Sequence, residues 1–345
     1  MESSYNKFQK YITKEHIKCY DYTTFRNARL ISFGEFEDVN RVIFKRDKTT
    51  VVLKSFNSNG NNNYAIIKEI INEIKLYRKV DIHPNIIRFH GVTKKEDNVN
   101  TNTIPYMLVL EYADSGTLES YLRENFKYLT WNDKIRFALQ TASAVRYLHS
   151  KRIVHLGLNS NNILIHQNNI KLSDIGLSKR LTKLKSNLNL REIPYMDPQY
   201  FIKNHDFKFD NNSDVYSIGI LMWEIANGHL PFKNIIDANA LIRNIVNGLQ
   251  EDPYHEAPHQ YIKIYTECWQ GAPENRPTIQ NVVLNLKALI ASTNNPTLLQ
   301  IPIQPQNYSI SQNSTSLHNN FLLQSFTSSQ NLNLQNSIPQ LNFLN

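Results

Sequence analysis

The eight residues His155-Leu156-Gly157-Leu158-Asn159-Ser160-Asn161-Asn162 lead directly into two short apolar stretches, residues 162–166 and 170–173. The cluster Gln167-Asn168-Asn169 separates these stretches, and Asp174-Ile175-Gly176 follows the second one. Short apolar runs on either side of a turn-type cluster predict a strand pair. Polar side chains that can bind ligands therefore flank a predicted hairpin.

The chain before this hairpin reads mainly as β-sheet. Apolar or alternating runs bounded by turn-type residues predict strands at residues 30–36, 39–44, 51–56 and 107–111. Between them, isoleucines and Tyr77 recur at helical spacing over residues 66–77, which predicts one helix.

The chain after about residue 114 reads mainly as α-helix. Apolar spacing predicts a helix over residues 135–148, and Thr130-Trp131-Asn132-Asp133 resembles a capping box at its start. Further helices are predicted at residues 216–226, 237–246, 260–268 and 278–290. A sheet-rich lobe followed by a helical lobe predicts an α+β fold with a cleft between the lobes, and such clefts are preferred ligand sites.

Further motifs accompany the hairpin in a fixed order. Lys54 ends the apolar pattern Val51-Val52-Leu53-Lys54, and Glu73 follows nineteen residues later. After the hairpin come Tyr195-Met196-Asp197-Pro198-Gln199, Ser213-Asp214-Val215-Tyr216-Ser217, Cys268-Trp269 and Pro273-Glu274-Asn275-Arg276-Pro277-Thr278. In this order and spacing, residues 20–290 resemble the protein kinase superfamily.

The resemblance extends to one branch of that superfamily. The Cys-Trp and Arg-Pro-Thr elements resemble tyrosine and tyrosine-kinase-like kinases, and Tyr20-Asp21-Tyr22 with Phe25 resembles the expanded tyrosine-kinase-like proteins of some fungi. The implied fold has a small antiparallel β-sheet lobe with one helix and a larger, mainly α-helical lobe. We expect a lead-in segment at 1–24, a kinase-like domain at 25–290 (small lobe 25–112, large lobe 113–290) and a tail at 291–345.

The resemblance also implies a site for ATP and Mg²⁺. Lys54 and Glu73 would form the ion pair that holds the phosphates, while Asn162 and Asp174 would bind magnesium through oxygen. The implied adenine-side residues are Gly34, Val39, Val52, Leu110, Glu111, Ala113 and Leu164.

The catalytic loop departs from the family pattern His-Arg-Asp. Gly157 occupies the position of the aspartate that accepts the substrate hydroxyl proton, and glycine has no group for this task. Asn159, at the next substrate-side position, is neutral, and Leu156 replaces an arginine. We expect His155 to be structural, with Ile175 packed behind it.

The phosphate-covering loop is altered as well. Gly34 alone remains of the three family glycines, and Ser32 and Glu37 occupy the other two positions. Glycines allow close approach of the backbone to phosphates, whereas a carboxylate repels them. Val52 replaces the usual alanine and narrows the adenine slot. ATP and Mg²⁺ are therefore expected to bind weakly.

The predicted activation segment, residues 174–199, is strongly basic. Its positive charges are Lys179, Arg180, Lys183, Lys185 and Arg191. The segment is either a solvated mobile loop or a docking surface for an acidic or phosphorylated protein partner. Gln199 replaces the glutamate that pairs with an arginine equivalent to Arg276, so we expect the charge-assisted bidentate pair to be lost.

Three functional hypotheses follow from these residues. The first is a signalling pseudokinase that binds ATP weakly and acts as a scaffold or regulator. The second is an active kinase that transfers the ATP γ-phosphate to Ser/Thr or Tyr of a protein. The third is an interaction protein that binds no nucleotide. The loop Asn159-Ser160-Asn161 matches neither the usual serine/threonine nor the usual tyrosine version.

Composition narrows the remaining classes. The net charge of +8 comes without a basic run of five residues, which argues against a nucleic-acid partner. Two cysteines cannot form a disulfide framework, and the first residues lack a signal-peptide core, so we expect an intracellular location, cytoplasmic or nuclear. No stretch is apolar enough to span a membrane: the most apolar one, residues 216–222, is too short.

The tail has a different composition from the domain. Residues 291–345 contain no Lys, Arg, Asp or Glu, and from Ser292 they hold 11 Asn, 9 Ser and 8 Gln. Such a composition predicts disorder, with either no role or weak association.

Overall fold

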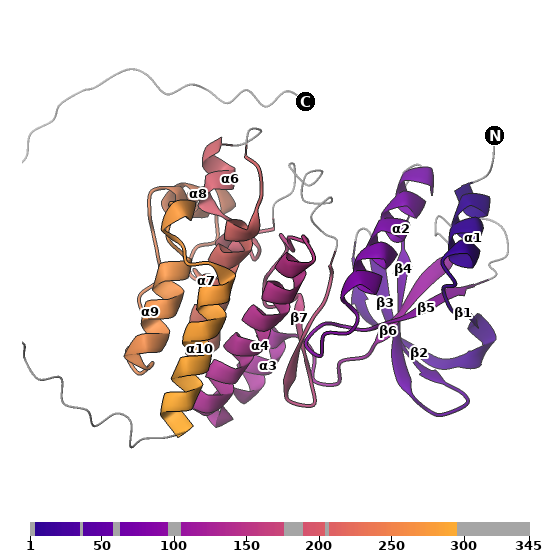
Figure 1. The fold of residues 1–345 in the computed structure, drawn as a ribbon, viewed down its shortest axis with the longest axis horizontal. Coiled ribbons are helices and arrows are strands. Elements are labelled where there is room, and N and C mark those ends of the chain that lie inside the picture. The colour runs from indigo at the N-terminus through magenta and orange to yellow at the C-terminus, as the bar shows by residue number, and fades with distance from the viewer. Residues whose placement is uncertain are drawn as a thin grey trace, which may run out of the picture. The chain divides into compact units, whose positions relative to one another are not determined.

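The computed structural model describes residues 4–34, 37–57, 63–95, 105–175, 189–203 and 207–294. Figure 1 shows a sheet lobe formed by the first third of the chain and a helical lobe formed by the rest, with β7 between them. The tail was predicted to begin at residue 291, but residues 291–294 continue the last helix; the rest of the tail and most of the basic activation segment lie outside the described residues. The predictions for these two regions therefore stay predictions.

The small lobe contains a six-stranded sheet. Its strands in chain order are β1 (Cys19–Asp21), β2 (Phe25–Phe33), β3 (Glu37–Phe44), β4 (Thr50–Phe56), β5 (Phe89–Lys94) and β6 (Tyr106–Glu111). The spatial order is β1-β5-β6-β4-β3-β2, and every neighbouring pair is antiparallel except β1 and β5. The four predicted strands correspond to β2, β3, β4 and β6, whereas β1 and β5 were not predicted.

Two helices cover this sheet lobe. The predicted helix is α2 (Asn63–Val80), which buries Ile70, Ile74 and Tyr77 completely. The second, α1 (Ser4–Lys14), comes from the lead-in segment and was not predicted. It buries Phe8 and Ile12, and the Phe8 ring meets the Tyr106 ring edge-on at 4.5 Å. Residues 4–21 thus add a helix and a strand to the small lobe.

The large lobe is built around one buried helix. Its helices are α3 (Leu118–Asn125), α4 (Trp131–Ser150), α6 (Pro198–Lys203), α7 (Asn211–Asn227), α8 (Ala238–Val246), α9 (His259–Cys268) and α10 (Ile279–Asn294). α7 is buried along almost its whole length, and α4 and α9 pack against it. Short 3₁₀ turns lie at Phe126–Tyr128, Ile193–Tyr195 and Pro273–Asn275.

Local signals in the sequence mark several of these element boundaries correctly. The predicted capping box is present, because Thr130 Oγ1 accepts the backbone N–H of Asp133 and the Asp133 carboxylate accepts that of Thr130. The predicted hairpin is β7 (Ile163–His166) and β8 (Asn169–Leu172). Its two turn residues, Gln167 and Asn168, have φ of 48° and 58°, as a tight hairpin turn requires.

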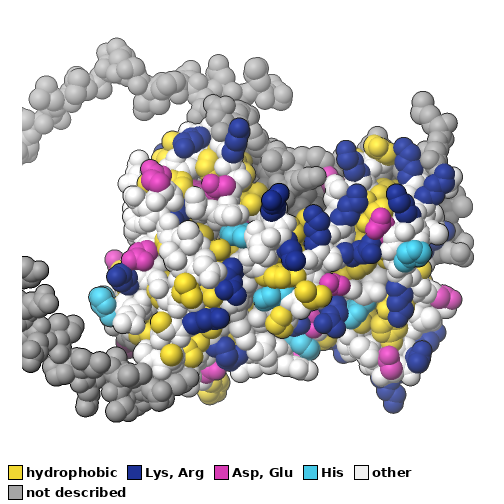
Figure 2. All heavy atoms as spheres, in the orientation of Figure 1, with side chains coloured by type: hydrophobic (Ala, Val, Ile, Leu, Met, Phe, Trp, Pro, Cys, Tyr) yellow, Lys and Arg dark blue, Asp and Glu magenta, His cyan; other side chains and the backbone are white. Residues whose placement is uncertain are grey.

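Within the described ranges, no helix is both long and apolar enough to cross a bilayer. On the face shown in Figure 2, Lys and Arg side chains predominate over Asp and Glu on the small lobe, in keeping with the positive net charge of the chain.

Candidate functional site

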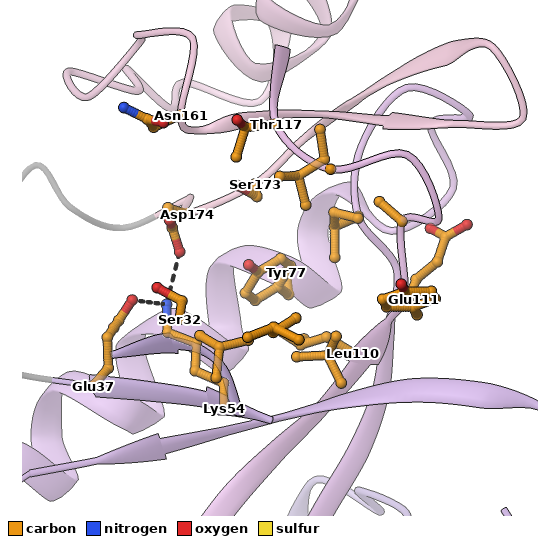
Figure 3. Close-up of a pocket in the computed structure, with 18 residues that line it drawn as sticks. Ser32, Glu37, Lys54, Tyr77, Leu110, Glu111, Thr117, Asn161, Ser173 and Asp174 are labelled. Carbon is orange, nitrogen blue, oxygen red and sulfur yellow. Dashed lines mark hydrogen bonds and ion pairs between the residues drawn. The ribbon is translucent and has the colours of Figure 1, made fainter. Parts of the chain in front are cut away.

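A cavity of about 360 Å³ lies between the two lobes. Its floor and walls come from β2, β3, β4 and α2 on one side, and from the connection after β6, the catalytic loop and the end of β8 on the other. Figure 3 shows side chains from both lobes pointing into the same space. The predicted site residues among its lining are Val39, Val52, Lys54, Leu110, Glu111, Ala113, Leu164 and Asp174.

The apolar part of the cavity is an adenine-sized slot. Register places Val52 opposite Leu110 on neighbouring strands, so both side chains lie on one face of the sheet. Leu164 on β7 belongs to the opposite lobe and lines the same space. Beyond this slot, the Glu111 carboxylate points away and pairs with Lys171 at 2.8 Å. An apolar slot with few polar groups is suited to a flat, aromatic ligand.

Lys54 is the polar centre of the cavity. Its ammonium lies 2.8 Å from Asp174, 2.9 Å from Glu37 and 3.1 Å from Glu73. Burial alone would lower the pKa of Lys54, but the carboxylates of Asp174, Glu37 and Glu73 outweigh it and hold that pKa well above its ordinary value. The lysine is therefore a fixed cation with three anionic neighbours.

The Glu37 contact concerns the phosphate side of the site. Glu37 is the first residue of β3, and its carboxylate contacts the Lys54 ammonium (Figure 3). The sequence predicts Glu37 to be part of the phosphate-covering loop. Its side chain is 19% exposed, against 4% for Lys54, so it meets the ammonium from the solvent side. A ligand phosphate that approaches Lys54 from that side must displace a carboxylate.

The catalytic loop is held together by backbone hydrogen bonds to its own side chains. His155 is completely buried, donates from Nε2 to the Ser173 carbonyl at 2.9 Å and accepts the Gly157 N–H at Nδ1. Burial lowers the pKa of His155, and both ring nitrogens are engaged. The predicted structural role of His155 matches these contacts.

The two amides of the loop also face inward. The Asn162 amide donates to the Gly157 carbonyl at 2.6 Å, and the Asn159 side chain accepts the N–H groups of Asn161 and Asn162. Within the described residues, no group of three or more His, Cys, Asp or Glu side chains could hold a metal ion. Of the two predicted magnesium ligands, Asp174 lines the cavity, whereas Asn162 is not among the lining residues and the neighbouring Asn161 is.

Asp214, on helix α7, holds this loop through hydrogen bonds to its backbone. It is completely buried and accepts the N–H groups of His155 at 2.8 Å and Leu156 at 2.9 Å, while His149 Nε2 lies 2.8 Å from it. Leu156 has a φ of 62° and Asp174 one of 55°, a region that L-residues enter at a cost. The network around Asp214 therefore holds the loop in a conformation that short-range preferences oppose.

One prediction about the large lobe is wrong. Arg276 forms a bidentate ion pair after all, with both oxygens of Asp197 at 2.6 and 2.9 Å. Gln199 instead donates to the Gly271 carbonyl at 3.1 Å. The charge-assisted pair is therefore retained, because its carboxylate is supplied two residues earlier in the chain.

Several predicted residues lie beside the cavity and do not line it. Glu73 reaches it through Lys54, and Gly34 lies where an added Cβ would be 3.1 Å from the Glu37 carbonyl. Of the basic residues in the activation segment, only Arg191 is among those described, and it pairs with Glu119 at 2.9 Å.

Other lining residues were not predicted as parts of the site. Tyr77 was predicted only as a helix core residue, yet it lines the cavity, and its buried hydroxyl has no partner within the described residues. The remaining ones are Ile31, Ile87, Tyr112, Gly116, Thr117, Asn161 and Ser173. Three of them, Tyr112, Asn161 and Ser173, adjoin predicted site residues in the chain, which is a signal that could have indicated them. Ser32 and Glu37, which the sequence predicts at glycine positions of the phosphate-covering loop, line the cavity as well.

Comparison with known proteins places these observations in context. A family described as protein tyrosine and serine/threonine kinase matches residues 25–286. Tyrosine-protein kinase Fer of Rattus norvegicus is 28% identical over 265 residues, which are 76% of this chain and 31% of the relative. Mitogen-activated protein kinase kinase kinase 13-B of Xenopus laevis is 31% identical over 217 residues, 62% of this chain and 21% of the relative.

A third relative comes from Dictyostelium discoideum. This probable LIM domain-containing serine/threonine-protein kinase is 30% identical over 268 residues, 76% of this chain and 39% of the relative. The match thus spans less than two fifths of the length of each of these three relatives.

Proposed function

The chain belongs to the family of protein tyrosine and serine/threonine kinases, and we propose that it is a signalling protein of that fold whose phosphoryl transfer is impaired. Its role would be that of a scaffold or regulator. The observation that carries this proposal is the backbone-only environment of Gly157. Its N–H donates to His155 Nδ1, and its carbonyl accepts from the Asn162 amide. The loop is therefore held by hydrogen bonds at a residue that has no side chain to accept a proton.

Among the described residues, no group beside Gly157 is free to take over the task of the missing carboxylate. Asp174 is bound to Lys54, and Asp214 is buried below the loop. Both nitrogens of His155 are engaged. General-base catalysis typically contributes 10²–10⁴ in rate, so its loss corresponds to about 3–5 kcal/mol of activation free energy.

The residues that would bind a nucleotide are present, but on the phosphate side Glu37 contacts the lysine that would bind the phosphates. The apolar slot fits an adenine ring, Lys54 and Glu73 would hold phosphates, and Asp174 with Asn162 would hold Mg²⁺. ATP with magnesium supplies the phosphoryl group in this family. Glu37 occupies the solvent side of Lys54, which supports weak rather than tight nucleotide binding.

Specific observations also favour the two alternatives. The Lys54–Glu73 ion pair at 3.1 Å is the arrangement an active kinase needs, so residual transfer to a protein hydroxyl is the second candidate. The Glu37–Lys54 pair favours the third candidate, an interaction protein without nucleotide. A phosphorylated or acidic protein partner at the basic activation segment remains part of the leading proposal.

The decisive experiment is a turnover assay of the purified chain. With Mg·ATP and a generic peptide substrate, we expect phosphate transfer at the background level set by a Lys54→Ala variant. A wild-type rate clearly above that background, and lost in both Lys54→Ala and Asp174→Ala, would establish the active kinase instead. The same variants also serve as controls for a contaminating kinase, because contamination would leave the rate unchanged in all three proteins.

A further inference from the structure

A second cavity, of about 580 Å³, lies on the other side of the connection between the lobes. Its lining includes Arg41 from β3, Arg88 and His90 at the start of β5, Tyr112 and Asp114 after β6, and His166 at the end of β7. Glu111 and Tyr112 line both cavities, so the connecting segment is a shared wall.

The carboxylates of the second cavity are already engaged. Glu111 pairs with Lys171 at 2.8 Å and accepts the backbone N–H of Arg88 at 3.1 Å. Asp114 accepts the hydroxyl of Ser115 at 2.7 Å and the N–H of Gln167 at 3.1 Å. Asp114 also lies 3.1 Å from Nδ1 of His166. Both carboxylates keep their negative charge, but their nearest charged or ionisable partners are Lys171 and His166 rather than the arginines of the cavity.

The cations of the cavity are not engaged in the same way. The Arg41 guanidinium lies over the Tyr112 ring, 5.2 Å from its centroid, which orients it without neutralising it. Across the described ranges, no carboxylate lies within 4.0 Å of Arg41, Arg88 or His90 to form an ion pair. The guanidinium groups of Arg41 and Arg88 therefore line the cavity without a carboxylate partner, and burial lowers the pKa of His90, which favours a neutral imidazole that can still donate one hydrogen bond.

We propose that this second cavity binds a phosphomonoester, held by Arg41 and Arg88 with His90 as an additional donor. A dianion matches two guanidinium charges, and guanidinium forks fit the oxygens of a phosphate. The hydroxyls of Thr49 and Thr50 line the same space and can donate further hydrogen bonds. The volume exceeds that of a bare anion, so there is room for the organic part of the ligand.

Calorimetric titration of the full chain with phenyl phosphate tests this inference. We expect saturable binding that weakens at least tenfold in Arg88→Gln and in Arg41→Gln. The matched control is Arg243→Gln, which removes the same charge from an exposed position on α8 and should bind as the wild type does. Equal affinity of wild type and both cavity variants would overturn the inference.

A second readout separates this cavity from the cleft at Lys54. In protein labelled at histidine, phenyl phosphate should shift the NMR signals of the His90 ring and leave those of the exposed His255 unchanged. These shifts should persist in Lys54→Ala and disappear in Arg88→Gln. Loss of the shifts in Lys54→Ala alone would place the ligand in the cleft and overturn the inference, whichever way the turnover assay comes out.

The source of the phosphate is resolved by a third titration. A peptide with one phosphotyrosine that binds more tightly than phenyl phosphate would identify a phosphorylated protein side chain as the ligand. Equal affinity would identify a small phosphomonoester. In both cases the unphosphorylated peptide should not bind, and binding of that peptide would count against phosphate recognition.

Discussion

The base of the large lobe and the phosphate side of the cleft use their charged residues differently. At the base, Asp214, Arg276 and Glu224 are at most 6% exposed and each is hydrogen-bonded to a partner within the lobe. On the phosphate side, Gly157 occupies the position of the family's catalytic aspartate, and the Glu37 carboxylate contacts the Lys54 ammonium. The three charged groups at the base are all paired within the lobe, whereas the phosphate side combines a glycine at the position of the family's catalytic aspartate with an added carboxylate on Lys54.

Losing a charged group costs different amounts of folding stability in the two regions. Removing one partner from a buried ion pair leaves an uncompensated charge and costs about 3–5 kcal/mol, a large part of a typical stability of about 5–15 kcal/mol. A catalytic carboxylate faces ligand and solvent, so its replacement leaves no buried charge behind. Loss of the catalytic carboxylate therefore costs little folding stability, whereas loss of a buried anchor costs a large part of it.

The largest effect is expected at the buried pair Asp197–Arg276. Asp197→Ala leaves the guanidinium buried without its carboxylate, and we expect the free energy of unfolding to fall by about 3–5 kcal/mol in urea denaturation. The matched control is Gln199→Ala, which removes one exposed hydrogen bond and should cost no more than about 1 kcal/mol. A larger loss at Gln199 than at Asp197 would mean that the anchor has been misidentified.

The second prediction concerns Glu224 and pH. Burial raises the pKa of Glu224 to about 7, from an ordinary value of 4.5, although the Tyr195 hydroxyl donates to it at 2.6 Å. Between these values the folded state binds more protons than the unfolded state, so the free energy of unfolding should fall as pH rises. At 1.36 kcal/mol per pKa unit the fall amounts to about 3 kcal/mol.

The measurement is urea denaturation of wild type and Glu224→Gln at several values from pH 5 to pH 8. The side-chain amide in Glu224→Gln does not ionise in this pH range, so this variant should lose the pH dependence. Glu274→Gln, an exposed change in the turn Pro273–Asn275, should keep it. Parallel stability curves for wild type and Glu224→Gln would show that Glu224 ionises in the fold as it does in the unfolded chain.

The third prediction moves to the catalytic loop. Gly157→Asp restores a carboxylate, and we expect the turnover rate to rise at least about 100-fold above the wild type. Among the described glycines, positive φ occurs at Gly91, Gly116, Gly228 and Gly248, so the backbone of Gly157 is outside the left-handed region that L-residues avoid. The free energy of unfolding should therefore change by no more than about 1 kcal/mol.

The control for this variant is Gly157→Asn, which has nearly the same size and shape but cannot take up the proton. It should remain at background in the turnover assay. An equal rise in both variants would attribute the effect to loop rigidity. No rise in Gly157→Asp would mean that the phosphate side of the cleft, and not the missing carboxylate, limits transfer.

The sequence predicts what depends on near neighbours in the chain. The capping box at Thr130, the turn at Gln167 and Asn168 and the helices of the large lobe follow from local residue chemistry. The motif order also brought Lys54, Glu73 and Asp174 correctly into one cluster. Each of these depends on a short pattern or on a spacing within a known family.

What the sequence did not predict depends on tertiary contacts. Strand β1 is stabilised by pairing with β5, some seventy residues away, and α1 by packing on α2. The Asp197–Arg276 pair joins residues 79 apart, and nothing local distinguishes Asp197 from a turn residue. Tyr77 has the spacing of a core residue, and only the position of α2 beside the cavity makes it part of the lining.

The smallest predicted effect tests the phosphate side directly. Glu37→Gln removes the carboxylate that meets Lys54 at 2.9 Å and leaves Glu73 and Asp174 in place. We expect the affinity for Mg·ATP to rise about tenfold, which is about 1.4 kcal/mol. The measurement is a thermal-shift titration, since a ligand that binds only the folded state stabilises it by RT ln(1 + [L]/Kd).

Asp38→Asn is the matched control for this change. Asp38 is the next residue on β3, carries the same charge and accepts from Asn57 at 3.3 Å instead of contacting Lys54. If the direct contact of Glu37 with Lys54 obstructs the phosphates, Asp38→Asn should raise the affinity far less than Glu37→Gln does. Equal gains would instead indicate a general acidic field, because both substitutions reduce that field by one charge. Only the first outcome attributes the expected weak binding of phosphates to the Glu37 side chain alone. It would then also attribute to Glu37 the difference between the fully paired base of the large lobe and the altered cleft.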